Sequence, residues 1–82
     1  MNGNELLTVI TISEQGSIKK AAQVLLKDMS SLSRCVKRVE KELDITLFRR
    51  TPLGLVLTPE GELYVEAARK MLELYEGLKT EK

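Results

Sequence analysis

The stretch "SIKKAAQVLLKDMSSLSRCVKRVEKEL", residues 17–43, contains two helical apolar patterns with a break between them. Ser17 is a good N-cap, and the apolar residues after it repeat at helical intervals up to about Leu26. Asp28 is the next N-cap candidate and opens a second helix that we expect over residues 29–43. A single long helix would need no such break. The spacing therefore predicts two helices that pack at an angle.

The second of these helices has an apolar face and a polar, basic face. The residues expected in the core recur at intervals of four, three and four, and they are Leu32, Val36, Val39 and Leu43. The polar side begins with serines and continues with cations: Ser30, Ser31, Ser33, Arg34, Lys37, Arg38 and Lys41. Small hydroxyls and cations near a helix N-terminus suit contacts with phosphates and base edges.

The rest of the chain predicts two further helices and a hairpin. A first helix is expected over about residues 4–14, ended by Gly16. The segment "RTPLGLVLT", residues 50–58, alternates around a Pro and Gly turn and predicts a small β-hairpin. Thr58 then caps a last helix over about residues 59–79, with a proline at its first position. The order predicts a mainly α fold: a winged helix-turn-helix with a small β-hairpin wing and a long C-terminal helix.

Composition limits the classes of function. With 82 residues, the chain holds one domain, and its 43% apolar and 30% charged residues suit a soluble globular fold. It has one cysteine, Cys35, and no histidine, so neither a disulfide within the chain nor a multi-cysteine zinc site is expected. No nucleophile–base pair, phosphate loop or membrane span is present in the sequence. We expect a cytoplasmic protein that is not an enzyme and binds no metal or cofactor.

Charge is unevenly distributed along the chain. The net charge is only +1, but residues 17–51 hold nine basic and four acidic residues, between two acidic flanks. A basic centre of this kind indicates a localised anion-binding face. A generic solvated surface would give the same count, so the charge pattern leaves both readings open.

Four segments in this order and spacing resemble a known family: "GSIKKAAQVL" (residues 16–25), "LSRCVKRVEKEL" (32–43), "LFRRT" (47–51) and "LTPEG" (57–61). The chain is similar over these residues to the N-terminal DNA-binding domain of LysR-type transcriptional regulators. The resemblance implies binding of double-stranded DNA at an interrupted palindrome, as a dimer or tetramer, with dimerisation through the last helix. A larger effector-sensing domain normally follows in the family. We therefore expect an isolated DNA-binding fragment or, alternatively, a naturally short protein.

The resemblance and the residue types together predict a DNA-binding set of thirteen residues. They are Ser17, Lys19, Asp28, Met29, Ser30, Ser31, Ser33, Arg34, Lys37, Arg38, Arg50, Thr51 and Leu53. The chain departs from the family pattern at Met29, where a base-reading glutamine is usual, and at Leu53, where the wing usually carries a cation. The alternative function is a winged helix used for protein–protein contact, which the basic, serine-rich helix disfavours.

The last helix carries an apolar stripe wider than one small core can cover. Its predicted dimerisation residues are Leu63, Tyr64, Ala67, Ala68, Met71, Leu72, Tyr75 and Leu78. We divide the chain into residues 1–58, the winged helix-turn-helix, and residues 59–82, a linker and dimerisation helix of the same unit. An antiparallel helix pair is expected, with Tyr75 of one chain near Tyr64 or Ala68 of the other. The alternative is a solvent-exposed, frayed end.

Three single residues complete the expectations. Cys35 is expected to be a half-buried packing residue, because no second cysteine is present to resolve an oxidised form. Phe48 is expected in the core. Glu40 lies within the basic segment and is expected either to orient Arg50 or Arg38, or to be an exposed, solvated carboxylate.

Overall fold

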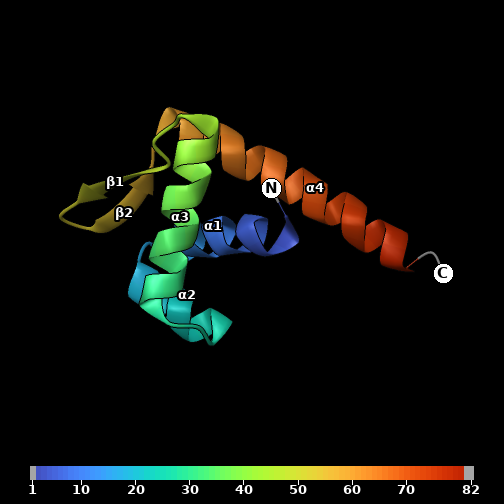
Figure 1. The fold of residues 1–82 in the computed structure, drawn as a ribbon, viewed down its shortest axis with the longest axis horizontal. Coiled ribbons are helices and arrows are strands. Elements are labelled where there is room, and N and C mark those ends of the chain that lie inside the picture. The colour runs from blue at the N-terminus through green and yellow to red at the C-terminus, as the bar shows by residue number, and fades with distance from the viewer. Residues whose placement is uncertain (1, 81–82) are drawn as a thin grey trace.

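The computed structural model describes residues 2–80, which form four helices and one antiparallel hairpin. The elements in chain order are α1 (Gly3–Gln15), α2 (Ile18–Leu25), α3 (Met29–Leu43), β1 (Phe48–Thr51), β2 (Gly54–Leu57) and α4 (Pro59–Thr80). Helix α3 crosses α1, the hairpin projects from one side of the body, and α4 extends from the other (Figure 1). The mainly α winged helix-turn-helix predicted from the sequence is confirmed.

The break between α2 and α3 is built from local capping contacts. Ser17 Oγ accepts a hydrogen bond from the Lys20 N–H at 3.2 Å, which caps the start of α2. Leu26 ends that helix in the left-handed conformation, with φ at 57°. Asp28 Oδ1 then accepts from the Ser31 N–H at 2.8 Å and starts α3. The predicted helix boundaries are confirmed to within about one residue.

The core lies where α1, α2, α3 and the first half of α4 meet. Its most deeply buried large side chains are Val9, Ile12, Leu32 and Leu47. Cys35 is also buried, more completely than expected, whereas Phe48 is only partly buried against this core. Leu43, predicted to be buried, is 42% exposed. That prediction is wrong because α3 packs on α1 and α2, and its last turn extends past them (Figure 1).

Side-chain hydrogen bonds to the backbone hold the chain between α3 and α4. Glu40 Oε2 accepts from the Leu47 N–H at 2.7 Å. Thr58 Oγ1 donates to the Thr46 carbonyl oxygen and accepts from the Gly61 N–H, the latter at 2.9 Å, so Thr58 caps α4 as predicted. Glu40 therefore fixes the loop entering β1. The expectation that it orients an arginine or is simply solvated is wrong, because a backbone N–H is its partner.

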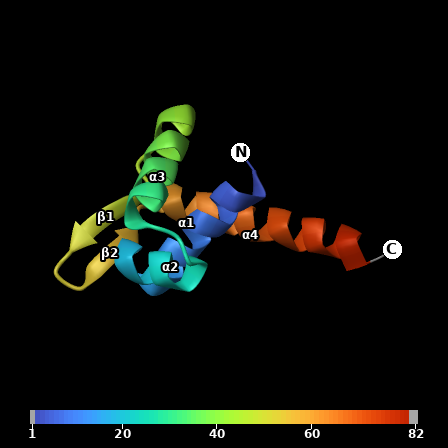
Figure 2. The same cartoon turned by 60° about the horizontal axis from the view of Figure 1, so that its bottom comes forward.

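The hairpin is attached to the turn between α1 and α2. The Leu55 N–H donates to the Gly16 carbonyl oxygen at 2.9 Å. Gly54 has φ at 124°, and a Cβ there would lie 2.7 Å from the same oxygen, so only glycine fits. Thr51 Oγ1 donates to the Gly54 carbonyl oxygen at 2.8 Å and closes the turn. The hairpin is thus a defined wing beside the beginning of α2 (Figure 2).

Helix α4 has two different halves. Its first half packs against α1 and β2, and Tyr64 and Ala68 are 7% and 1% exposed within the core of their own chain. These two residues were predicted to serve dimerisation; the prediction is wrong, because the protomer already covers them. The second half extends beyond the body (Figure 1). Among the described residues, no helix is both long and apolar enough to span a membrane.

Candidate nucleic-acid interface

One groove collects side chains from three separate parts of the chain. It has a volume of about 400 Å³ and lies between the start of α2, the first turns of α3 and the wing. Six of the thirteen predicted DNA-binding residues line it: Ser17, Lys19, Met29, Ser33, Arg50 and Thr51. We call it the wing groove. Because the wing is attached to the α1–α2 turn, Arg50 of β1 and Lys19 of α2 line the same groove.

The wing groove is suited to an anion. Lys19 and Arg50 are exposed, and neither has a carboxylate partner among the residues that the structure describes. Ser17 and Ser33 add hydroxyls, and the first turn of α2 adds backbone N–H groups without intrahelical partners. Two unpaired cations beside a helix N-terminus match the groups that proteins use to bind phosphates.

A second groove lies on another side of α3 and has a volume of about 410 Å³. We call it the Lys27 groove, and the residues that line it include Asn4, Lys27, Asp28, Ser31, Arg34 and Arg38. Lys27 Nζ donates to Asn4 Oδ1 at 2.6 Å, which joins the end of α2 to the start of α1. Sequence reasoning counted Lys27 in the basic centre but did not select it or Asn4. Lys27 lies in a turn, outside any periodic pattern, so only its charge signalled it.

Two predicted contact residues have structural partners in this groove. Hydrogen bonds from the Ser31 side chain and backbone hold the pKa of Asp28 below its usual value, so the carboxylate is ionised. In this structure Asp28 acts as the cap of α3. Arg38 Nη1 lies 3.0 Å from Glu5 Oε2 of α1. The Arg38 side chain is 60% exposed, so part of it still faces solvent.

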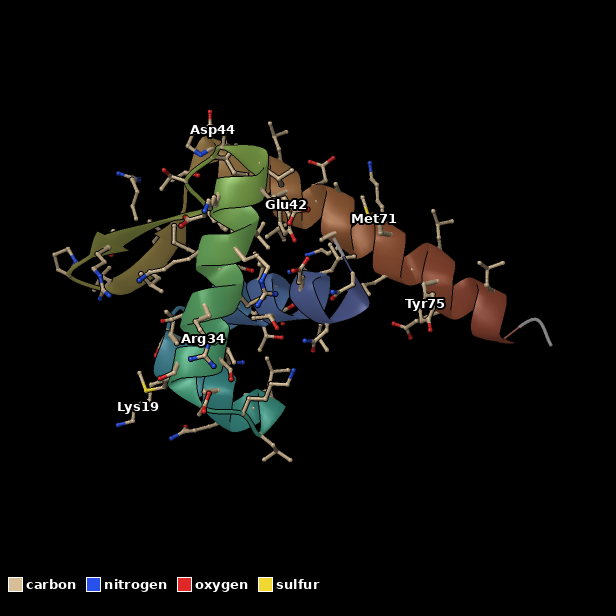
Figure 3. The ribbon with its side chains drawn as sticks, viewed as in Figure 1. Lys19, Arg34, Glu42, Asp44, Met71 and Tyr75 are labelled. Carbon is tan, nitrogen blue, oxygen red and sulfur yellow. The ribbon has the colours of Figure 1, made fainter. Side chains whose placement is uncertain are left out.

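The remaining predicted residues lie on the outer edge of α3 and at the wing tip. Ser30 and Lys37 are exposed on the side of α3 away from the core. Leu53 is 98% exposed between the two strands. Lys19 and Arg34 occupy the same end of the molecule, at the beginning of α2 and α3 (Figure 3). The predicted DNA-binding residues therefore lie in the two grooves beside α3, on its outer surface and at the wing tip.

Exposed apolar side chains run along one side of α4, from its first half into the half that extends from the body. We define the α4 stripe as Leu63, Ala67, Met71, Leu74, Tyr75 and Leu78. Figure 3 shows Met71 and Tyr75 on the part of α4 that extends from the body. Leu72, predicted for the same role, is half-buried against the core. Leu74, which is 72% exposed, was missed, although its spacing from Met71 and Leu78 is helical.

Comparison with known proteins identifies the family. Residues 4–62 match the family model described as "Bacterial regulatory helix-turn-helix protein, lysR family". The chain is 38% identical over 80 residues to the HTH-type transcriptional regulator CrgA of Neisseria meningitidis, covering 98% of this chain and 27% of that protein. It is 36% identical over 76 residues to the HTH-type transcriptional regulator CysL of Bacillus subtilis, covering 93% and 25%. The chain thus spans about a quarter of the length of these relatives.

Solved structures agree with the sequence match. The structure titled as a complex of the CbnR DNA-binding domain with DNA superposes with a TM-score of 0.92 at 28% identity, covering 99% of this chain and 93% of that one. The complex of the BenM DNA-binding domain with benA site 1 DNA gives a TM-score of 0.92 at 30% identity, covering 98% and 93%. The alternative of a protein-binding winged helix receives no support from these matches. The chain belongs to the LysR family of bacterial regulatory helix-turn-helix proteins, as a DNA-binding domain of that family.

Proposed function

We propose that this chain binds double-stranded DNA sequence-specifically as a homodimer, with α3 in the major groove and the wing along the minor groove. The observation that carries the proposal is the wing groove, where α2, α3 and the wing bring unpaired cations and hydroxyls together. Helix α3 is the element that enters DNA because its face opposite the core is polar and exposed, and the major groove admits one helix.

The roles of the side chains follow from where they lie. Ser30, Ser33 and Lys37 occupy the outer surface of α3 and would face base edges. Lys19 and Arg50 would contact phosphate oxygens from the wing groove and set the register of the helix on the duplex. The titles of the matched CbnR and BenM structures name complexes of such domains with DNA, which supports this assignment.

The α4 stripe supports the homodimer. Its leucines and methionine lie outside the core of the protomer and extend along one side of the helix. Each such side chain, once fully buried, is worth about 1.5–3 kcal/mol. Pairing α4 with a second copy would bury several of them and would hold two recognition helices at a fixed distance. Binding to two half-sites of a palindrome requires such a fixed distance.

The test of DNA binding is a pair of arginine substitutions. Arg50→Ala should weaken binding to any duplex about tenfold at low salt and reduce the slope of log affinity against log salt, because one phosphate contact and its counterions are lost. Arg69→Ala removes the same charge from α4, where the arginine pairs with Glu14 at 3.1 Å, and should leave binding unchanged. Fluorescence anisotropy over a salt series measures both. Equal effects of the two substitutions would mean that net charge, and not the wing groove, drives binding.

A further inference from the structure

The wing groove and the Lys27 groove lie on two sides of the same helix. The wing groove is lined from α3 by Met29 and Ser33, which are four residues apart. The Lys27 groove is lined from α3 by Ser31, Arg34 and Arg38, which share a second row of helical spacing. At 3.6 residues per turn these two rows face roughly opposite directions. Helix α3 therefore stands between two grooves, each of which contains cations.

DNA presents a matching arrangement. The major groove is about 12 Å wide, and a helix with its side chains is about 10–12 Å across. A helix in that groove consequently has one phosphate backbone along each flank. The proposed function places one strand beside the wing groove. The Lys27 groove then faces the other strand.

We propose that the Lys27 groove binds the phosphate backbone of the second DNA strand, with Lys27 as the contacting cation and Asn4 as the residue that positions it. This inference rests on the proposed function and adds a site to it. The Lys27 ammonium donates one hydrogen bond to Asn4 Oδ1 at 2.6 Å, and two further N–H groups can donate to phosphate oxygens. Lys27 itself is exposed.

The other charges around this groove leave Lys27 and Arg34 as its effective cations. Arg38 is paired with the Glu5 carboxylate, and the Asp28 carboxylate is held at the N-terminus of α3. Among the described residues, the side-chain hydrogen bond of Arg34 goes to the Ser31 hydroxyl, at 3.4 Å, and not to a carboxylate. Backbone contacts also fix where Lys27 lies. The Lys27 N–H donates to the Ala22 carbonyl oxygen at 3.0 Å, directly after Leu26 ends α2 in the left-handed conformation.

The experiment compares variants of the whole chain on a duplex of about 20 base pairs over a salt series. Lys27→Gln should weaken binding to DNA duplexes of different sequence by about the same factor. It should also lower the salt slope by about one for each bound protomer. Lys27→Arg keeps the cation and should retain the slope. Lys70→Gln makes the same charge change on α4, where the lysine lies 3.5 Å from Glu66, and should have no effect.

Asn4→Ala distinguishes DNA contact from support of the fold, because it breaks the same hydrogen bond but keeps the cation. The affinity of this variant should fall, because Lys27 is no longer positioned, but by a smaller factor than in Lys27→Gln, and its salt slope should stay closer to the parental value because the cation remains. A parental slope in Lys27→Gln, or an equal loss of slope in Asn4→Ala and Lys27→Gln, would overturn the inference, and parental affinity in Asn4→Ala would remove the positioning role of Asn4. If Lys27→Gln has the parental slope while Arg50→Ala does not, the proposed function stands and only the second site is wrong. If neither variant lowers the slope, the proposed function fails as well.

Discussion

The carboxylate of Glu5 on α1 is held by the guanidinium of Arg38 on α3, with Arg38 Nη1 3.0 Å from Glu5 Oε2. The Glu5 side chain is 5% exposed and lies at the contact between the two helices, so the pair joins α3 to α1. The hydrogen bond from Arg38 is the main reason why the pKa of Glu5 is below its usual value. Burial of the carboxylate acts in the other direction and raises the pKa.

Removing the arginine should therefore destabilise the fold. Arg38→Ala is expected to lower the free energy of unfolding by about 1–3 kcal/mol, since it removes a charged hydrogen-bond donor from a buried carboxylate. Lys41→Ala, on an exposed position of the same helix, should change it by less than about 0.5 kcal/mol. Urea denaturation at pH 7 measures both. Equal stability of the two variants would show that the ion pair contributes nothing.

The same pair should make stability depend on pH. Because the folded pKa of Glu5 is below the unfolded value of about 4.3, the contribution is complete above that pH and is lost as the pH falls through the folded pKa. Glu5→Gln does not titrate. The stability difference between the parent chain and Glu5→Gln should therefore shrink as the pH falls from about 5 through the unfolded value of about 4.3 and below it. A difference that stays constant over this range would exclude Glu5 as the titrating group.

A close backbone contact at Gly61 supports the start of α4. A Cβ there would lie 2.2 Å from the Leu47 carbonyl oxygen, so Gly61→Ala should destabilise the chain by about 2–4 kcal/mol, as overpacking of a core does. Gly77 lies on the same helix with open space around it. Gly77→Ala should raise stability by about 0.5–1 kcal/mol through helix propensity. Thermal unfolding that ranks the two variants in the opposite order would contradict this packing.

The sequence predicted those parts of the fold that depend on local chemistry. Caps such as Ser17 and Asp28 act within three residues, so their residue types are enough to predict the helix ends. Periodicity could not divide the apolar surface of α4 between the protomer and a partner. Tyr64 and Ala68 therefore had to be reassigned to the core once the path of the chain was known.

Partners distant in the chain were beyond prediction for the same reason. Lys27 and Asn4 are separated by 23 residues, and Glu5 and Arg38 by 33, and no local pattern links such pairs. Glu40 was expected to orient an arginine or to be solvated, because of the charge around it, whereas its partner is a backbone N–H. Charge in the sequence located the interface region. The structure divided it into two grooves.

The wing tip offers an apolar side chain where a cation would strengthen binding. Leu53 is 98% exposed, and its N–H donates to Thr51 Oγ1 at 3.2 Å, so its place at the tip is defined. Leu53→Arg should raise DNA affinity and increase the salt slope by about one per protomer, because arginine adds a phosphate or minor-groove contact. Glu73→Gln, on α4, adds the same net charge away from the wing. Equal gains in the two variants would show that the tip does not approach DNA.

Met29 provides a test of base reading. It is 50% exposed at the first position of α3 and lines the wing groove. A methionine offers only apolar contact, for example to a thymine methyl group, whereas glutamine can make two hydrogen bonds to adenine. Met29→Gln should therefore shift preference toward adenine at one position by about 1–3 kcal/mol. Selection of binding sites from random DNA measures the preference. Identical selected sites for the parent chain and the variant would exclude Met29 from base contact.

Dimerisation through the α4 stripe is the remaining prediction. Leu74 and Leu78 are 72% and 70% exposed and lie beyond the residues that α4 packs against α1. Replacing both with glutamate should therefore leave the fold of the protomer intact while placing charges in the proposed interface. A monomer presents only one recognition helix at a time. Affinity for a two-half-site duplex should fall far more than affinity for a single half-site.

Arg69→Glu is the matched control, because it makes the same change in net charge on the same helix. Arg69 contributes only an exposed ion pair with Glu14, and a surface pair of this kind is worth about 0–1 kcal/mol. Analytical ultracentrifugation should then find the parent chain and Arg69→Glu as dimers and the double variant as a monomer, with unchanged helical circular dichroism in all three. A parent chain that is monomeric at high micromolar concentration would contradict the homodimer, since a chain that pairs its stripe should associate well below that concentration.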